Sequence, residues 1–324
     1  MARGKRRSWK LKRLKTRTQN DLQALQQGQS FTGQESKAWY DKHYKLLLLI
    51  PFLILLGSVL ILLHHKSTTG SFLELGIQLK GGSSLIVKPL QDSSITALKL
   101  ETDLQKAFPD QDFIVRKLSK TTGSELSVET TAINSDLDNV KQFLTSKGFK
   151  ILSSNTISPS LGTGFAKQAV KAVIIAFLLM AIVVFFYFRV LVPSLAVVLA
   201  AFSDIVTTLA LTTIFDIKIN TASVAAVLML IGYSVDTDIL LSTRILKEKH
   251  LSVNKRILTA LKTGLTMSFT TIAAVIVALI ATTSPVIKDV MSVLLIGLIV
   301  DLINTWIQNA GILKWYVESK KVRG

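Results

Sequence analysis

The chain has 324 residues, of which 49% are hydrophobic and only 18% are charged, and its mean hydropathy is +0.45, which excludes a purely soluble protein. It contains no cysteine, which excludes disulfide scaffolds, thiol catalysis and thiolate metal sites. The formal net charge is +17, but the bases lie beside apolar segments rather than on one soluble face, so no specific nucleic-acid partner is expected.

Residues 1–45 form a basic tail with twelve Lys and Arg against three acids. We expect this tail to fix the topology and to lie on anionic lipid headgroups, with contact to ribosomal RNA as the alternative. The apolar run 46–63 follows and is eighteen residues long, enough to cross a bilayer core of about 30 Å. It is too long, and begins too far along the chain, for a cleaved signal peptide, so it predicts a first transmembrane helix.

The polar interval 64–168 alternates strand and helix patterns and predicts an external domain. Short alternating runs predict strands, and capped amphipathic segments predict helices. The expected elements are strand 83–89, helix 94–108, strands 113–118 and 125–130, helix 134–147 and strand 149–157. This β-α-β-β-α-β order predicts a small α+β domain of the ferredoxin-like kind. The interval has no GxSxG sequence and no phosphate loop, so we expect a binding or lever module without catalysis.

Residues 169–313 contain the remaining apolar runs, at 170–188, 190–215, 219–242, 264–283 and 290–313. With the first run they predict a polytopic α-helical membrane protein with six transmembrane helices. In the short connections, Lys and Arg concentrate in the basic tail, at Arg189, between Arg244 and Lys262, and in the C-terminal tail 314–324. The positive-inside rule then predicts a multi-pass protein of the cell membrane with both termini cytoplasmic and the domain 64–168 outside.

Four acidic residues lie inside the expected spans. Asp204 is near the middle of the third span, Asp236 and Asp238 are in the fourth, and Asp301 is near the middle of the sixth. An ionisable side chain at bilayer depth costs about 2.5–3.5 kcal/mol on insertion scales and faces the bundle interior by default. For Asp204 or Asp301 taken singly, packing between helices explains the residue as well as a functional role does.

The segment Asp236-Thr237-Asp238 is harder to explain by packing, because it doubles this cost within three residues. Its two carboxylates point about 200° apart on a helix, so one faces the bundle and the other faces the helix end or a neighbouring chain. A buried carboxyl can bind and release a proton near working pH, and a nearby ammonium can tune it. We therefore expect this segment to form a proton relay.

Three stretches of the sequence resemble the SecD/SecF family of protein-export membrane proteins, in the resistance-nodulation-division superfamily. They are 76–82 (GIQLKGG), 158–162 (SPSLG) and 232–244 (GYSVDTDILLSTR). The third is the most specific, and its Tyr-Ser-Val-Asp-Thr-Asp form is similar to the archaeal SecF type. The resemblance covers about residues 45–315. Gln78 and Leu79 depart from the acidic and aromatic residues common at the domain entry, and Lys262-Thr263 stands where bacterial members have Arg-Thr.

The resemblance implies a SecF-like subunit that promotes polypeptide export and is coupled to the proton gradient, with no enzymatic activity, cofactor or metal. Its implied partners are a SecD-like membrane protein, the Sec translocon and the translocating polypeptide. The implied relay consists of Asp236, Asp238 and Thr237 with Lys262 as electrostatic partner, and Gly81 with Gly82 forms a flexible hinge into the external domain.

Two other functions remain open from the sequence. The first is half of an exporter of small molecules or lipids from the same superfamily. Such an exporter would be distinguished by a second external domain or a fused second half. The second is an intramembrane aspartyl protease, in which two carboxylates share a proton and activate water. That fold requires Tyr-Asp and Gly-x-Gly-Asp settings on two membrane helices, and the apolar runs of this sequence contain neither.

Overall fold

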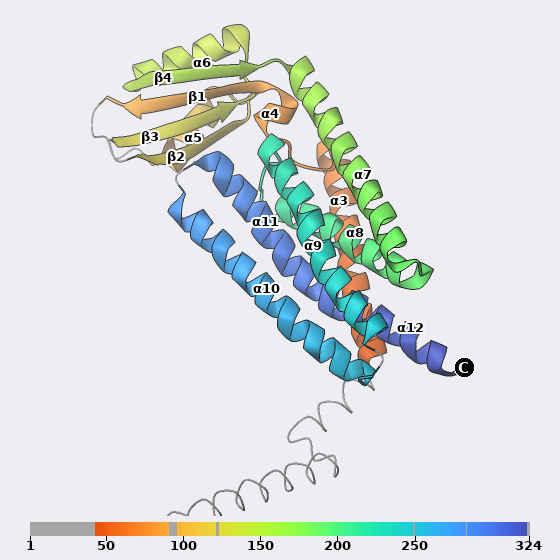
Figure 1. The fold of residues 1–324 in the computed structure, drawn as a ribbon. Coiled ribbons are helices and arrows are strands. Elements are labelled where there is room, and N and C mark those ends of the chain that lie inside the picture. The colour runs from red at the N-terminus through yellow and green to blue at the C-terminus, as the bar shows by residue number, and fades with distance from the viewer. Residues whose placement is uncertain (1–42, 91–95, 121–122, 249, 283, 323–324) are drawn as a thin grey trace, which may run out of the picture. The chain divides into compact units, whose positions relative to one another are not determined.

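The computed structural model describes residues 43–90, 96–120, 123–248, 250–282 and 284–322 (Figure 1). The expectations for residues 1–42 of the basic tail, including lipid contact, lie outside this part. Five described helices are long and apolar enough to cross a membrane: His43–Thr69, α7 (Pro159–Phe188), α8 (Leu191–Ile214), α9 (Thr221–Lys247) and α10 (Val253–Ala281). The chain is therefore a multi-pass membrane protein, as its composition predicts.

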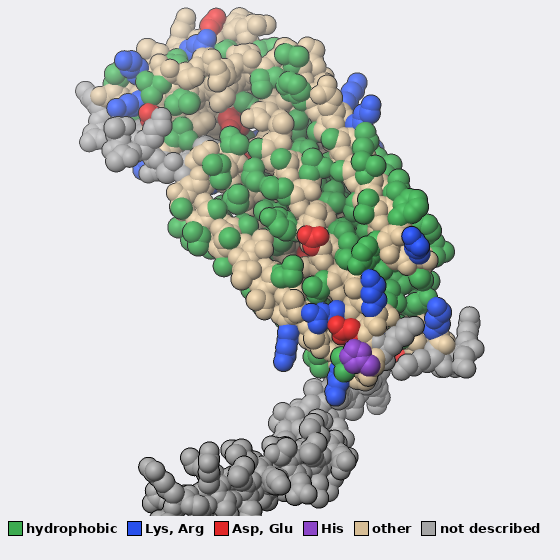
Figure 2. Space-filling model, in the orientation of Figure 1, with side chains coloured by type: hydrophobic (Ala, Val, Ile, Leu, Met, Phe, Trp, Pro, Cys, Tyr) green, Lys and Arg blue, Asp and Glu red, His purple; other side chains and the backbone are tan. Residues whose placement is uncertain are grey.

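Helices α8 and α9 form the centre of the helical part. In α8, 61% of the most apolar stretch is buried inside the protein, and in α9 50%, whereas α7 buries only 6% and α10 17%. The outer helices present large apolar side chains to their surroundings, and Figure 2 shows such side chains across this surface. Without a hydrophobic driving force between helices in lipid, small residues favour close packing, and Ala196, Ala200 and Ala201 are buried on α8.

Helix α11 (Pro285–Ile303) is not among the five apolar helices, because its nineteen residues include Lys288, Asp289 and Asp301. It packs against α8, α9 and α10, and Val293, Leu294 and Leu298 join the buried core between them. The chain continues helically through a π-helix, η1 (Asn304–Asn309), into α12 (Ala310–Val322). The apolar run 290–313 thus corresponds to three consecutive helical segments.

A four-stranded antiparallel sheet lies between α3 (Leu49–Thr69) and α7 in the chain (Figure 1). Its strands, in the order β2-β3-β1-β4 across the sheet, are β1 (Gly82–Pro89), β2 (Phe113–Lys120), β3 (Gly123–Thr130) and β4 (Phe149–Ile157). Helix α5 (Ala97–Ala107) connects β1 to β2, and α6 (Asn134–Ser146) connects β3 to β4. Val87 pairs with Leu126, and Val115 with Val128, which fixes the register of the central strands.

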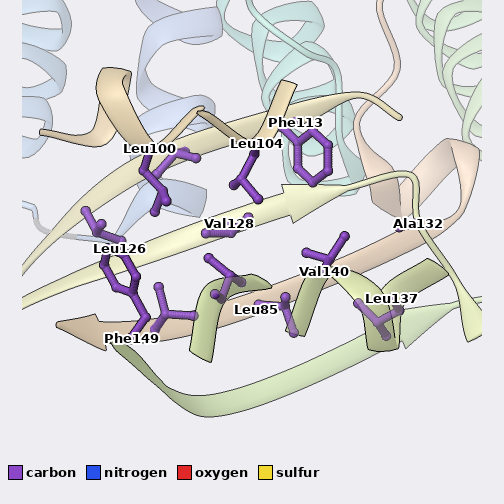
Figure 3. Packing of buried hydrophobic residues seen from close by; sticks show 13 residues of the cluster. Leu85, Leu100, Leu104, Phe113, Leu126, Val128, Ala132, Leu137, Val140 and Phe149 are labelled. Carbon is purple, nitrogen blue, oxygen red and sulfur yellow. The ribbon is translucent and has the colours of Figure 1, made fainter. Parts of the chain in front are cut away.

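One hydrophobic core joins both helices to one face of the sheet (Figure 3). Alternate residues of a strand face opposite sides, so the apolar residues of the strands gather on the face that the helices cover. The core contains Leu85 and Val87 of β1, Phe113 and Val115 of β2, Leu126 and Val128 of β3, Phe149 of β4, Leu100 and Leu104 of α5, and Leu137, Val140 and Leu144 of α6. The opposite face is left for other contacts.

The entry and the exit of this domain pack closely against each other. Gly81 has φ +92° and Gly82 has φ +139°, in the region that favours glycine. A Cβ atom on Gly81 would lie 2.5 Å from Pro159 Cα, and one on Gly162 would collide with the backbone of Gly81. Two of the three family-like stretches, 76–82 and 158–162, therefore meet backbone to backbone. The hinge role of Gly81 and Gly82 stays a prediction, since close approach by itself also requires glycine here.

Candidate functional site

The structure gathers three of the four intramembrane carboxylates into one buried polar cluster. Asp204 on α8, Asp238 on α9 and Asp301 on α11 have exposed fractions of 0%, 0% and 1%. We call these three residues the carboxylate cluster. Three helices distant in sequence contribute one acid each, which helical periodicity within a single segment cannot reveal.

Asp204 accepts two hydrogen bonds from neighbouring helices. Ser234 Oγ on α9 donates to one carboxylate oxygen at 2.5 Å, and Asn304 Nδ2 of η1 donates to the other at 2.7 Å. Both donors are buried, so these bonds compensate for the loss of water around the carboxyl group. Asp204 is thereby connected to both helices that carry the other acids, because η1 continues α11.

The hydroxyl of Thr305 connects the other two acids. Its oxygen lies 3.0 Å from Asp238 Oδ1 and 2.9 Å from Asp301 Oδ1. A threonine hydroxyl has one proton and can donate to only one of these oxygens at a time. The second contact is favourable only if that carboxyl is protonated and donates to Thr305. Thr237, from the expected relay, also contacts Asp301 at 3.4 Å while donating to the Ser234 carbonyl at 2.8 Å.

The π-helix η1 provides most of the polar neighbours of the cluster. A π-helix closes hydrogen bonds five residues apart, which brings Asn304 and Asn309 towards one face, and such segments are frequent at functional sites. Asn309 Nδ2 donates to Asp238 Oδ1 at 2.7 Å, and Gln308 Nε2 donates to Ser203 Oγ at 3.2 Å. Asn304, Thr305, Gln308 and Asn309 are all buried.

The carboxylate cluster has no cationic partner in the part of the chain that the structure describes: its three acids contact hydroxyl groups, amide groups and, between Asp204 and Asp301, each other. Asp238 Oδ2, Gln308 Oε1 and Asn309 Oδ1 are buried and have no hydrogen-bond partner among the residues that the structure describes. Among the described residues, no group of three or more His, Asp or Glu side chains has the arrangement of a metal site. Buried carboxyl groups that lie close together among hydroxyl and amide donors can take up, share and release protons.

Asp236 and Lys262 lie outside the carboxylate cluster. Both side chains are exposed, and among the described residues neither has a hydrogen bond or an ion pair with the cluster. Asp236 is two residues from Asp238 and so lies on another face of α9. The polar contact between α9 and α10 at this level is Arg244 Nη2 to Thr263 Oγ1, at 3.4 Å. The structure thus brings Asp238 and Thr237 of the expected relay together with Asp204 and Asp301, and leaves Asp236 and Lys262 at the surface.

A second polar site connects the sheet to the outer end of the helical part. Arg116 of β2 donates from Nη1 to both oxygens of Asp289 on α11, at 3.0 and 2.9 Å. Asn220 Nδ2 donates to the same carboxylate at 2.7 Å, while Asn220 Oδ1 caps α9 by accepting from the Ser223 backbone at 2.8 Å. We call Arg116, Asp289 and Asn220 the docking contact.

Backbone and charged groups extend the docking contact. Ile219 pairs with the segment 74–76 through two backbone hydrogen bonds: Gly76 N donates to Ile219 O at 2.9 Å, and Ile219 N donates to Glu74 O at 2.7 Å. Glu129 of β3 lines the same small pocket as Arg116 and Lys218. Burial raises the pKa of Glu129 above its ordinary 4.5, and Asp289 raises it further, while Arg116 and Lys218 oppose the shift.

Residues 139–319, more than half of the chain, match the family model described as "Protein export membrane protein SecD/SecF, C-terminal". Curated relatives agree over a longer stretch. The SecF protein of Pyrococcus furiosus is 39% identical over 282 residues, which cover 86% of this chain and 92% of that protein. The chain belongs to the SecF family of protein-export membrane proteins. The SecF protein of Methanocaldococcus jannaschii is 37% identical and is matched over 99% of its length.

A solved structure of SecDF from Thermus thermophilus, described as a translocon-associated membrane protein, has the same fold as this SecF-family chain. The TM-score is 0.69 at 19% identity, over 86% of this chain but only 38% of the SecDF chain. SecDF in a super-membrane-facing form gives a TM-score of 0.61 over 87% of this chain. The family assignment confirms the resemblance that the sequence motifs indicated.

Sequence reasoning missed the polar groups that surround the carboxylate cluster. Asn304, Thr305, Gln308 and Asn309 are four polar residues within six positions of an otherwise apolar run. Such a density of amides and hydroxyls at membrane depth is itself a signal for a buried polar site. Ser234 had no comparable signal, because a single serine in a membrane helix is common.

Proposed function

We propose that this SecF-family chain acts as an accessory subunit of the Sec translocation machinery and couples polypeptide export to the proton gradient through the carboxylate cluster. The names of the curated relatives and the SecDF fold support the first part. The observation that carries the second part is the cluster itself: three buried acids on three helices, surrounded by neutral donors.

The proposed arrangement in the membrane has six crossings, with α11, η1 and α12 forming the sixth. It comprises a cytoplasmic basic tail 1–45, helix 46–63, an external domain 64–168, helices within 169–313 and a cytoplasmic tail 314–324. The antiparallel order β2-β3-β1-β4, with both helices on one face, supports a ferredoxin-like external domain. The bases at Arg189 and between Arg244 and Lys262 support cytoplasmic termini.

Electrostatics support proton exchange at the cluster. Because both Asp238 Oδ1 and Asp301 Oδ1 contact the same Thr305 hydroxyl, the two oxygens are at most about 6 Å apart. Two full charges at that separation repel by roughly 3 kcal/mol at an effective dielectric constant of about 20. Binding a proton removes this repulsion and satisfies the second contact of Thr305. Gain and loss of a proton therefore change which hydrogen bonds connect α9 to α11.

Helix α11 provides a mechanical route from the cluster to the external domain. Asp289, in the docking contact, and Asp301, in the cluster, are on the same helix and about 18 Å apart at 1.5 Å per residue. Arg116 binds the outer end of this helix directly. A shift of α11 that follows proton binding is thus passed to the sheet, and we propose that Gly81 and Gly82 form the hinge for its movement.

The surface residues of the expected relay support a membrane partner. An exposed Asp236 facing lipid costs about 2.5–3.5 kcal/mol, a cost that a neighbouring protein can remove. The chain matches only 38% of the SecDF chain, which leaves room for a SecD-like half in another polypeptide. We propose that Asp236 and Lys262 connect the partner-facing surface to Asp238 and Thr237, and that the complex acts on a polypeptide emerging from the Sec translocon.

The test uses the complex of this chain with its SecD-like partner in proteoliposomes with and without an imposed proton gradient. Asp238→Asn and Asp301→Asn should abolish the gradient-stimulated part of polypeptide export and leave the basal part. Asp138→Asn, which changes an exposed acid on α6, is the matched control and should behave like the wild type. Full stimulation in the Asp238→Asn/Asp301→Asn double variant, at normal complex yield, would refute proton coupling through the cluster.

A further inference from the structure

A cavity of about 510 Å³ lies at the end of the helical part opposite the sheet. It is formed where α7 and α9 end, where α8 and α10 begin, and along α12. Its volume is within the range of sites that hold small molecules or lipid headgroups. The cavity is separate from the carboxylate cluster: none of its lining residues belongs to the cluster or contacts one of the three acids.

The polar lining of the cavity is entirely cationic or neutral. Lys247 of α9, Arg256 of α10 and Lys320 of α12 line it, and among the described residues no carboxylate does. Tyr187 and Tyr316 add two phenol hydroxyls. Cationic and hydroxyl donors without an acidic neighbour form the donor set that recognises phosphate oxygens.

Each lysine is positioned by one of the tyrosines. Lys247 Nζ lies 5.2 Å from the ring centroid of Tyr187, and Lys320 Nζ lies 5.4 Å from that of Tyr316. These cation–π contacts hold the ammonium groups beside the cavity without neutralising them. Within the described residues, no ion pair involves either lysine, so both charges are available to an anion.

Arg256 forms the rigid floor of the cavity. Arg256 is only 4% exposed. Its guanidinium group donates from Nε to Leu251 O at 2.8 Å and from Nη1 to Ile245 O at 2.7 Å. A guanidinium has five N–H donors, so these two bonds leave donors for a ligand while they fix the orientation of the group. A buried, oriented cation at the base of a cavity favours an anionic occupant.

The remaining walls identify the occupant as a lipid rather than a free anion. They are apolar except for Thr243, whose hydroxyl lies 3.3 Å from that of Tyr187, and otherwise consist of Phe188, Val190, Ile245, Leu246 and Val317. Beside them, Phe186 is 70% exposed and Leu191 is 60% exposed, on α7 and α8, which are long and apolar enough to cross a membrane. Figure 2 shows Lys and Arg side chains gathered at this end of the apolar surface. Basic pockets between transmembrane helices are typical headgroup sites, and tyrosines favour the membrane interface.

We propose that this cavity binds the phosphate-bearing headgroup of an anionic lipid, with Lys247, Lys320 and Arg256 on the phosphate and the apolar walls on the first part of the lipid chains. The proposal does not rest on proton coupling. It gives the family fold a specific lipid ligand at the junction of α7, α9, α10 and α12.

Native mass spectrometry of the full chain tests the proposal, with phosphatidylglycerol, phosphatidylcholine and inorganic phosphate as probes. One molecule of phosphatidylglycerol should stay bound to each protein chain in the mass spectrum. Phosphatidylcholine and inorganic phosphate should both bind more weakly. Lys247→Gln and Lys320→Gln should each weaken this binding about fivefold, and together roughly 25-fold. Lys255→Gln changes an exposed lysine of α10 that does not line the cavity and is the matched control.

Three results would each overturn the proposal. The first is equal binding of phosphatidylcholine, which would mean that the cations do not select the headgroup. The second is inorganic phosphate binding as tightly as the anionic lipid, which would assign the cavity to a free anion. The third is an equal loss in Lys255→Gln, or no loss in the Lys247→Gln/Lys320→Gln double variant, which would assign the lipid to general surface charge.

Discussion

The docking contact gives the sharpest quantitative prediction for this protein. Arg116 and Asp289 form two charge-assisted hydrogen bonds, at 3.0 and 2.9 Å, and their side chains are 29% and 13% exposed. A hydrogen bond to a charged group contributes about 1.5–3 kcal/mol, and partial exposure reduces this value. We therefore expect a coupling energy of about 1–2 kcal/mol between the two side chains, measured in a double-mutant cycle of Arg116→Gln and Asp289→Asn.

Hydrogen exchange of the Gly76 and Ile219 amides is the assay, because both are bonded in the backbone pairing beside this ion pair. A loss of 1–2 kcal/mol corresponds to exchange that is about five- to thirtyfold faster if the pairing opens together with the docking contact. Asn220 still donates to the changed side chain at position 289, so the single variants should weaken the contact without unfolding the domain.

The exposed ion pair of Lys141 and Asp138 on α6 provides the control cycle. Its side chains are 33% and 69% exposed, so its coupling should be below about 0.5 kcal/mol. If Arg116→Gln and Asp289→Asn are additive within that same limit, the two groups do not interact energetically. The mechanical route from α11 to the sheet would then lose its basis.

Three further predictions concern single positions. Burial raises the pKa of Glu129, so the contribution of this side chain to stability is complete below about pH 4.5 and is lost as the pH rises through the raised pKa. Glu129→Gln should therefore raise the thermal midpoint more at pH 7.5 than at pH 4.5. An equal effect at both pH values would contradict the burial argument. Gly264→Ala should cost about 1–3 kcal/mol in unfolding assays, because its Cβ collides with the Trp306 ring, whereas Gly164→Ala, with nothing within 4 Å, should be close to neutral. Thr305→Val should cost about 1–3 kcal/mol because it removes the buried hydroxyl that bridges Asp238 Oδ1 and Asp301 Oδ1, although Asn309 still donates to Asp238 Oδ1. Thr208→Val removes a buried hydroxyl that makes no hydrogen bond among the described residues and should not destabilise; similar costs for both would show that the Thr305 bridge contributes nothing.

Local sequence patterns predicted the bounds of the strands and helices of the α+β domain closely. The strand expected at 83–89 is Gly82–Pro89, and the strand expected at 149–157 is Phe149–Ile157. The helix expected at 94–108 is Ala97–Ala107, a difference at the ends, where helix boundaries are least determined by sequence. These elements are short and amphipathic, so their periodicity alone reports which face is buried.

The functional site was predicted in part. The four acids were found because charge at bilayer depth is rare, whatever the fold. Their grouping was not predicted: the sequence analysis placed Asp236 and Asp238 in one relay, although their side chains point to different faces of α9. The contact between α8, α9 and η1 brings Asp204 and Asp301 to Asp238 instead. Contacts between distant helices depend on packing, which sequence spacing does not encode.

The sequence alone determined that this chain crosses a membrane several times, that it has an α+β insertion after the first crossing, and that acidic side chains lie within its apolar segments. These features could be predicted because hydropathy, periodicity and charge are properties of individual segments. Only the tertiary structure decided which acids meet, that a π-helix supplies their donors, and that an arginine of the sheet binds the same helix that carries Asp301. These features arise from the packing of segments that are a hundred residues or more apart in the sequence, such as Asn304 with Asp204 and Arg116 with Asp289. The hydrogen bonds that define both sites exist only after the helices have packed.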